Sequence, residues 1–219
     1  MVEPTLGSAE VAEQADASVS KTDVRKDVRV RLPLSAPRRY ETGWTVIRLH
    51  PVDIARSPAE RILELTALIG EAEMAAWCAG LLDGSITYDD PRRPPITWLG
   101  GRHAAALQLK HGAAWGEQNY WPRVWAGRGL LYVWSASATS AVLSGLHDGA
   151  WRVREMSAKV ARRREVAVAE PILVALLDDP MQRVRAASDA ALSALTARES
   201  ARFPGSRRPR SWPRCRPLR

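Results

Sequence analysis

Tryptophan and arginine are the residue types in this chain best suited to recognise another molecule. Trp121 and Trp125 stand four residues apart, which puts them on one face of an expected helix, and arginines flank them. Aromatic rings beside arginines suit a protein-binding hot spot or stacking with nucleic-acid bases. The alternative is that the rings fill the core between small residues such as alanine and glycine. The clustered tryptophans are Trp98, Trp115, Trp121, Trp125, Trp134 and Trp151.

Histidine and cysteine show no spacing that would build a metal site or a nucleophile. His103 and His111 lie eight residues apart on an expected helix, but only Glu117 is near enough in sequence to be a third ligand. Cys78 falls on an apolar stripe, where we expect a buried thiol. The sequence contains no glycine-rich phosphate loop, nucleophile elbow or zinc-protease motif. It therefore predicts a protein that is not an enzyme, with no metal and no cofactor.

The positive charge of the chain is concentrated at its C-terminal end. The whole chain of 219 residues carries a net charge of +8, and residues 197–219 hold eight arginines and one glutamate. Residues 1–196 therefore carry a net charge of only about +1. The four prolines and the charge of 197–219 predict a disordered tail. This tail either binds nucleic acid weakly and non-specifically or has no role beyond solubility.

The N-terminal segment, residues 1–43, is predicted to be disordered or extended. Its first twenty residues contain four acids, no cation and no apolar period. They also lack the basic and apolar stretches of a secretory signal. No run of 18 apolar residues occurs, so we expect no membrane span and a cytoplasmic location.

The helical region opens with a clear start signal. Ser57, Pro58 and Glu60 form the pattern of a capping box with proline at the first helical position. Apolar residues then recur at helical spacing until Gly70, where we expect the helix to end. Two further helices are predicted near residues 71–82 and 98–109.

An internal repeat is the most informative feature of the sequence. Asp148 and the run Arg152-Val153-Arg154 recur 31 residues later as Asp179 and Arg183-Val184-Arg185. A weaker copy covers 120–134, and we align it 29 residues upstream because this register preserves the apolar stripe. A register of 31 would instead place Pro122 opposite Val153. A period of about 30 residues built from helix pairs indicates an α-solenoid.

The segment LLDDPMQRVRAASDAALSAL, residues 176–195, resembles a HEAT-like repeat of the short type found in bilin-lyase-like proteins. The resemblance covers about 120–196, and the chain as a whole is similar to HEAT-repeat proteins of high-GC bacteria. It implies an all-α fold: a HEAT-like α-solenoid of antiparallel helix pairs. The expected organisation is a helical domain at 44–196 between disordered termini, 1–43 and 197–219.

The resemblance also implies a role for the repeated acids and arginines. In HEAT-like repeats the equivalent residues form a ladder between neighbouring turns, which here would join Asp148, Arg154, Asp179 and Arg185. Both aspartates would lie at helix N-termini, where a carboxylate is favoured. A ligand-binding role for these residues is the alternative to this structural one.

A fold of this kind presents an extended binding surface, so we expect a non-catalytic protein-interaction or scaffold module whose partner is another protein. The candidate partner-binding residues are Trp121, Trp125, Trp151, Arg152 and Arg183. The alternative is a nucleic-acid-binding enzyme on the same fold, similar to a DNA glycosylase, which would need a carboxylate among the aromatic rings. Glu117 is the single acid between Trp98 and Leu146. The two functions differ in whether Glu117 or Asp148 points into an aromatic cleft.

Overall fold

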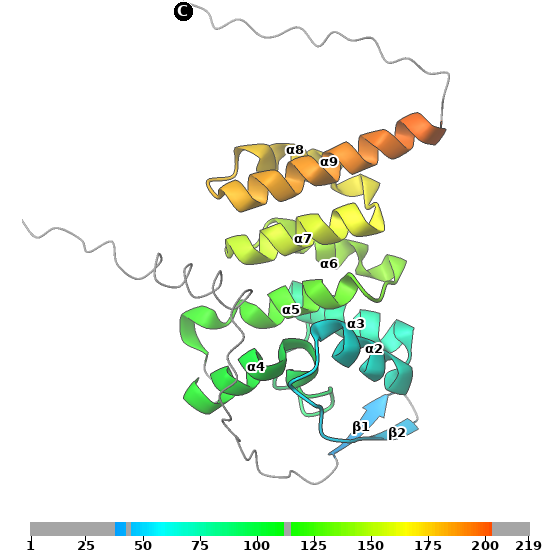
Figure 1. The fold of residues 1–219 in the computed structure, drawn as a ribbon, viewed down its shortest axis with the longest axis vertical. Helices are drawn as coiled ribbons and strands as arrows, with labels where there is room; N and C mark the ends of the chain where they lie inside the picture. Colours follow the sequence, from blue (N-terminus) through cyan, green and yellow to red (C-terminus); the bar gives the residue numbers. More distant parts are fainter. Residues whose placement is uncertain (1–37, 43–44, 112–114, 203–219) are drawn as a thin grey trace, which may run out of the picture. The chain divides into compact units, whose positions relative to one another are not determined.

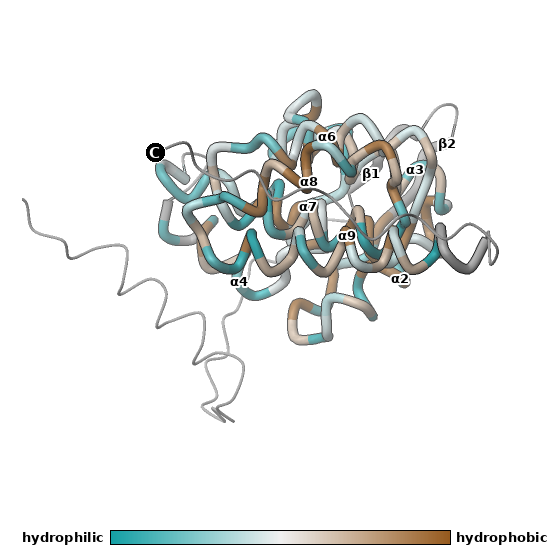
Figure 2. Tube along the Cα trace, turned by 90° about the horizontal axis from the view of Figure 1, so that it is seen from above, coloured by the Kyte–Doolittle hydropathy of each residue, from teal (hydrophilic) through white to brown (hydrophobic). Residues whose placement is uncertain are grey.

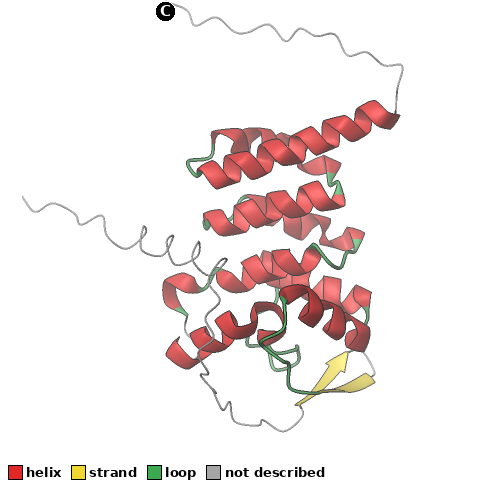
Figure 3. Ribbon diagram, in the orientation of Figure 1, coloured by secondary structure: helices red, strands yellow, loops and turns green. Residues whose placement is uncertain are grey.

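The computed structural model describes residues 38–42, 45–111 and 115–202, so the calls made for most of the N-terminal segment and for 203–219 lie outside the described residues. One antiparallel hairpin is present, in which β1 (Arg38–Thr42) pairs with β2 (Thr45–Leu49). Every other element in the described ranges is helical (Figure 3). The predicted all-α class is therefore confirmed for the described chain beyond the hairpin.

The first helix of the described residues, α2 (Pro58–Ile69), begins as its sequence predicts. The backbone N–H of Glu60 donates to the Ser57 hydroxyl, and the backbone N–H of Ser57 donates to the Glu60 carboxylate. This reciprocal pair satisfies two N–H groups that an open helix end leaves without partners. The helix ends at Gly70, whose φ of 90° is open to glycine at little cost. The capping box and the stop at Gly70 are thus confirmed.

The next two described helices pack against α2, and a buried arginine of α2 bonds to one of them. They are α3 (Glu71–Asp83) and α4 (Thr97–His111), and α4 is broken at Gly101, where φ is 57° and ψ is −136°. The buried Arg61 of α2 donates from Nε to the carbonyl of Trp98 and from Nη2 to that of Leu99. A Cβ at residue 101 would lie 2.5 Å from the Arg61 Cζ, so the close approach requires glycine there.

The repeat region supplies the remaining helices. Short 3-10 turns precede several of them, for example at Ala136–Ala138 and Ala167–Ala169. The helix α9 continues past Thr196, so the first residues of the segment predicted to be disordered are helical. The bounds are α5 (Trp121–Leu130), α6 (Thr139–Leu146), α7 (Trp151–Arg164), α8 (Glu170–Ala175) and α9 (Gln182–Arg202).

Contacts between these helices define two neighbouring rows. In one row α7 packs against both α5 and α9, and these three helices follow one another in Figure 1. In the other row α6 packs against both α3 and α8. The rows are joined because α3 contacts α5, α6 contacts α7, and α8 contacts α9. Each helix of the repeat region therefore buries one face against its own partner and another against the next unit.

Large apolar side chains fill the space between the rows. Fully buried examples are Trp77, Met74 and Leu82 on α3 and Leu130 on α5. Figure 2 shows both hydrophobic and hydrophilic residues along the described helices, as expected where only one face of a helix is buried. Across the described residues no single helix is long and apolar enough to cross a membrane, although α2 and α3 would pass that test together despite the 120° bend between them.

Candidate functional site: a strip of aromatic rings and arginines

Two ion pairs connect successive units of the repeat. Arg123 on α5 contacts Asp148 with Nε 2.6 Å from Oδ2, and Arg154 on α7 contacts Asp179 with Nε 2.7 Å from Oδ2. A second bond, from Nη2 to Oδ1, makes each pair bidentate. Each arginine precedes its aspartate by 25 residues. The sequence separation and the geometry of the ion pair are therefore the same in both units.

Each aspartate also organises the turn in which it lies. The Asp148 carboxylate accepts the N–H of Ala150 at 2.7 Å, and the Asp179 carboxylate accepts that of Met181 at 2.8 Å. From the following helix, Arg154 donates Nη1 to the carbonyl of Asp148, and Arg185 donates Nη1 to the carbonyl of Asp179. The four residues expected in a ladder lie together, but Asp148 meets Arg154 through its backbone and meets Arg123 through its side chain.

These contacts correct the register chosen for the weaker repeat copy. Arg123 takes the place of Arg154 in the ion pair, which is an offset of 31 residues and not 29. Buried positions follow the same offset, since Ala126, Ser157 and Ser188 are all fully buried. Pro122 fits opposite Val153 because it lies in the first turn of α5, where a missing N–H costs nothing. The register of 31 also reveals Arg123, which the sequence comparison left out of the ladder.

The carboxyl of Asp179 is held in its charged form. Burial raises its pKa, but hydrogen bonds from Arg154 and from the Met181 N–H, with the charges of Arg154 and Arg185, outweigh burial. The net result is a pKa below the ordinary aspartate value. A permanently charged, bidentate carboxylate suits a structural tie better than proton transfer.

Beside the ladder runs a surface that we call the aromatic–arginine strip. The guanidinium carbon of Arg152 lies 4.3 Å from the ring centroid of Trp151, 5.5 Å from that of Trp121 and 5.8 Å from that of Tyr120. The guanidinium of Arg183 lies 5.4 Å from the ring of Trp151. Such distances are typical of cation–π contacts. The strip consists of Tyr120, Trp121, Trp151, Arg152 and Arg183.

The register of 31 explains why rings and guanidiniums come together in this strip. Trp121, Arg152 and Arg183 hold the same repeat position, at the first or second residue of α5, α7 and α9. Helices that stack side by side bring equivalent positions next to one another. The strip therefore crosses the N-terminal turns of α5, α7 and α9, which are neighbours in one row, and Trp151 packs against Arg152 of its own helix and Arg183 of α9.

Burial separates the candidate partner-binding residues into two groups. Trp125 is 1% exposed and packs on Trp115 and Trp121 with ring centroids 5.7 and 6.0 Å away, so it belongs to the core. Trp121 is 9% exposed and is therefore nearly buried as well. Trp151 and Arg152 are half-buried, and the side chain of Arg183 is 51% exposed. The accessible part of the strip is therefore its α7 and α9 end.

Glu155 contacts the strip and is already engaged. Glu155 is largely buried on α7, and its Oε1 accepts Lys159 Nζ at 2.7 Å and Arg183 Nε at 3.3 Å. The Asp148 carboxylate points to Arg123 on the neighbouring helix and not into an aromatic cleft. Glu117 lies exposed on the 3-10 turn Gly116–Gln118. The acids named for the glycosylase alternative thus have the placements expected for a ladder and a surface.

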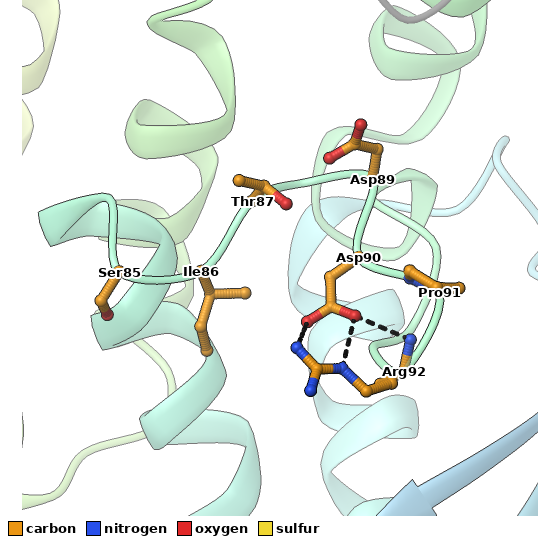
Figure 4. A pocket seen from close by; sticks show the side chains of 7 residues that line it. All are labelled: Ser85, Ile86, Thr87, Asp89, Asp90, Pro91 and Arg92. Atoms are coloured by element: carbon orange, nitrogen blue, oxygen red, sulfur yellow. Dashed lines mark hydrogen bonds and ion pairs between the residues drawn. The ribbon is translucent and has the colours of Figure 1, made fainter.

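A shallow depression elsewhere is formed by the loop between α3 and α4 (Figure 4). Asp90 and Arg92 face each other there, with Nε–Oδ1 and Nη2–Oδ2 distances of 3.0 Å. The hydrogen bond from Arg92 holds the pKa of Asp90 below its ordinary value. The two opposite charges of this depression therefore pair with each other within one loop. Across the described chain, no group of three or more potential metal ligands lies close enough to hold an ion.

Comparison with known proteins, made against family models, curated sequences and solved structures, returned no match for this chain.

Proposed function

We propose that the described helices form a HEAT-like α-solenoid of antiparallel helix pairs, and that the chain is a non-catalytic protein-interaction or scaffold module. The period of 31 residues in the ion pairs supports the solenoid, because each unit repeats the contacts of the one before it. The two rows of helices support it as well, since each unit contributes one helix to each row.

The observation that carries the interaction role is the accessible end of the aromatic–arginine strip. Trp151 and Arg152 are half-buried and stack on each other, and Arg183 beside them is half-exposed. Tryptophan and arginine dominate the energetics of protein interfaces because they bury much area and make directional hydrogen bonds. Stacking fixes their rotamers before a partner arrives, which lowers the entropy cost of binding.

The electrostatics of this end favour a partner with negative charge. The strip lies on the N-terminal turns of α7 and α9, where the helix dipole adds partial positive charge. The acids of the ladder are each neutralised by an arginine at 2.6–2.7 Å. Glu155 beside the strip is likewise paired, with Lys159 and Arg183, so the cations Arg152, Arg183 and Lys159 outnumber this one carboxylate.

The proposal is tested by placing a photo-crosslinking side chain at Gln182, the exposed first residue of α9 beside Arg183. The matched control is the same group at Arg162, exposed in the last turn of α7. We expect Gln182 to crosslink a protein that Arg162 does not. The affinity of that protein, once purified, should fall in Arg183→Ala and not in Arg162→Ala. Equal crosslinking at both positions, or equal affinity of both variants, would overturn the interaction role of the strip.

A further inference from the structure

The last described pair of helices leaves one surface uncovered. In the described chain α9 ends one row of helices and α8 ends the other (Figure 1). Leu146 is 0% exposed, whereas Leu177, its equivalent 31 residues later, is 37% exposed. Ala158 on α7 is also 0% exposed, whereas its equivalent on α9, Asp189, is exposed. These positions mark the surface that a following unit would cover. We call it the end face, and it consists of Leu177, Arg185, Ala186 and Asp189.

Arg185 on the end face is held in the same way as a ladder arginine. Its Nη1 donates to the carbonyls of Asp179 and Pro180 at 2.7 and 3.0 Å, and Nη1 of Arg154 donates to the two equivalent carbonyls at 2.8 and 3.0 Å. The other edge of Arg154, formed by Nε and Nη2, binds the carboxylate of Asp179 in the next unit. In Arg185 the same two groups make no hydrogen bond to a described residue. This edge is therefore oriented toward the position at which a following unit would place its aspartate.

The sequence does not continue the ladder beyond Arg185. The separation of 25 residues that joins each arginine to its aspartate leads from Arg185 to Arg210, which carries the same charge. Ladder-type pairing of Arg185 therefore needs a carboxylate from a different source. A guanidinium edge of this kind binds a carboxylate with two parallel hydrogen bonds, so the chemistry of the missing partner is defined.

The end face carries an acid of its own. Asp189 lies one helical turn after Arg185, about 6 Å along the helix axis. It is exposed and forms no ion pair or hydrogen bond with a described residue. Across a twofold axis, residue i of one copy contacts residue j of the other while j contacts i, so an arginine and an aspartate on one face can both be paired. Ala186 lies between them and lets two helices approach, and Leu177 adds apolar area. The end face is thus complementary in charge to a second copy of itself.

We propose that the end face binds the end face of a second copy of this chain. In the resulting twofold dimer, Nε and Nη2 of Arg185 donate to the Asp189 carboxylate of the partner subunit, and the reciprocal pair forms at the same time. The end face does not include Arg152 or Arg183 of the strip. The inference therefore goes beyond the proposed function and concerns a different surface.

The test measures the average mass of the full-length protein in solution by sedimentation equilibrium. We expect the wild type to show a monomer–dimer equilibrium between about 1 and 200 μM protein. Arg185→Glu and Asp189→Arg each bring like charges together across the twofold axis, so each variant should dimerise at least about tenfold more weakly. The matched control is Arg162→Glu, a charge reversal at an exposed arginine outside the end face, which should leave dimerisation unchanged.

An equimolar mixture of the two variants separates a lost contact from a damaged fold. Arg185→Glu leaves two negative charges on the end face, and Asp189→Arg leaves two positive charges. Both pairs across the axis of a mixed dimer are therefore attractive, and we expect the mixture to recover the association that each variant lacks alone. A variant that had failed to fold could not be rescued in this way, and thermal melting of each variant checks its fold independently.

Three results would overturn the inference. One is a wild type that stays monomeric over this range, and another is a mixture of the two variants that stays monomeric. The third is association that neither charge reversal weakens, which is the result expected if the arginine-rich residues 197–219 attract the acidic residues 1–20. A second copy crosslinked from Gln182 is recognised by its doubled mass, whereas the strip is tested with a different protein and Arg183→Ala. The proposed function and this inference can therefore fail separately.

Discussion

Arg154 and Asp179 stand 25 residues apart in the chain and form a bidentate pair, with Nε–Oδ2 and Nη2–Oδ1 distances of 2.7 and 3.1 Å. Their side chains are 14% and 3% exposed, so the pair is nearly free of solvent. Arg154 also donates to the carbonyls of Asp148 and Gly149 in the turn before its own helix. One guanidinium therefore fastens two successive turns of the repeat.

Removing the guanidinium of Arg154 should lower the free energy of unfolding more than removing that of Arg185, its counterpart in the next unit. Arg154→Ala leaves a buried carboxylate at Asp179 without its ion-pair partner, so we expect the free energy of unfolding to fall by about 3 kcal/mol. The hydrogen bonds of Arg185 go to the carbonyls of Asp179 and Pro180, so Arg185→Ala should cost about 1 kcal/mol. Urea unfolding of both variants measures the two values. Equal losses would contradict the unequal roles.

The Arg154–Asp179 pair also predicts that the free energy of unfolding falls at acid pH. The pKa of Asp179 is lowered in the folded protein, so the unfolded chain binds more protons at acid pH. The stabilisation is fully present above the unfolded pKa, about 4, and is lost as the pH falls through the folded pKa. Urea unfolding at several pH values should show a smaller fall in the free energy of unfolding at acid pH for Asp179→Asn than for the wild type. Parallel pH profiles would exclude Asp179 as a source of acid sensitivity.

Two serines at equivalent repeat positions are buried. Ser157 and Ser188 are 0% exposed, and their Oγ atoms have no hydrogen-bond partner among the described residues. Because burying an unpaired hydroxyl costs about 1–3 kcal/mol, Ser188→Ala should stabilise the protein by up to about 1 kcal/mol after packing losses. Ser193→Ala on the exposed side of the same helix measures the gain in helix propensity alone. Thermal unfolding should place Ser188→Ala above this control.

The contact between α6 and α7 depends on the absence of a side chain at residue 145. A Cβ on Gly145 would lie 2.3 Å from the Oγ of Ser157 and 3.1 Å from Cδ1 of Leu82. Gly145→Ala should therefore destabilise the protein by about 1–3 kcal/mol through overpacking. Gly149, whose added Cβ would meet nothing within 4 Å, provides the control Gly149→Ala. A melting temperature that is unchanged by Gly145→Ala would show that the helices can move apart freely.

The thiol of Cys78 should report global unfolding. Burial raises its pKa to about 12, so at neutral pH almost no reactive thiolate forms in the folded protein. In a Cys215→Ser background, a thiol reagent should label Cys78 only at the denaturant concentrations at which circular dichroism reports unfolding. Labelling in native buffer would reveal local opening of α3. The labelling transition is compared with the circular dichroism transition at the same denaturant concentrations. The result therefore does not depend on which thiol reagent is used.

The parts of the fold that sequence could predict are those determined by neighbouring residues. Ser57 and Glu60 are three residues apart, and their capping box forms as expected. Trp121 and Trp125 share a helix face, and their rings lie 6.0 Å apart. In both cases helical geometry alone brings the groups together, so no tertiary contact has to be known.

The features that could not be predicted from the sequence depend on tertiary packing. Arg61 is buried only because Gly101 breaks α4 and frees two carbonyls that lie 37 and 38 residues away. Trp125 became a core residue because Trp115 and His103 close over it. Arg123 was missed because Pro122 argued against the true register, although the first turn of a helix accepts proline.

The ladder also bears on how such a chain changes length over evolutionary time. Each ion pair joins neighbouring units only, at a separation of 25 residues within a period of 31. A gene duplication that copies residues 149–179 would place a new arginine and a new aspartate at this same separation, and every existing pair would survive. An insertion between an arginine and its aspartate would instead change the separation of that pair. Selection on stability alone would thus favour growth by whole units.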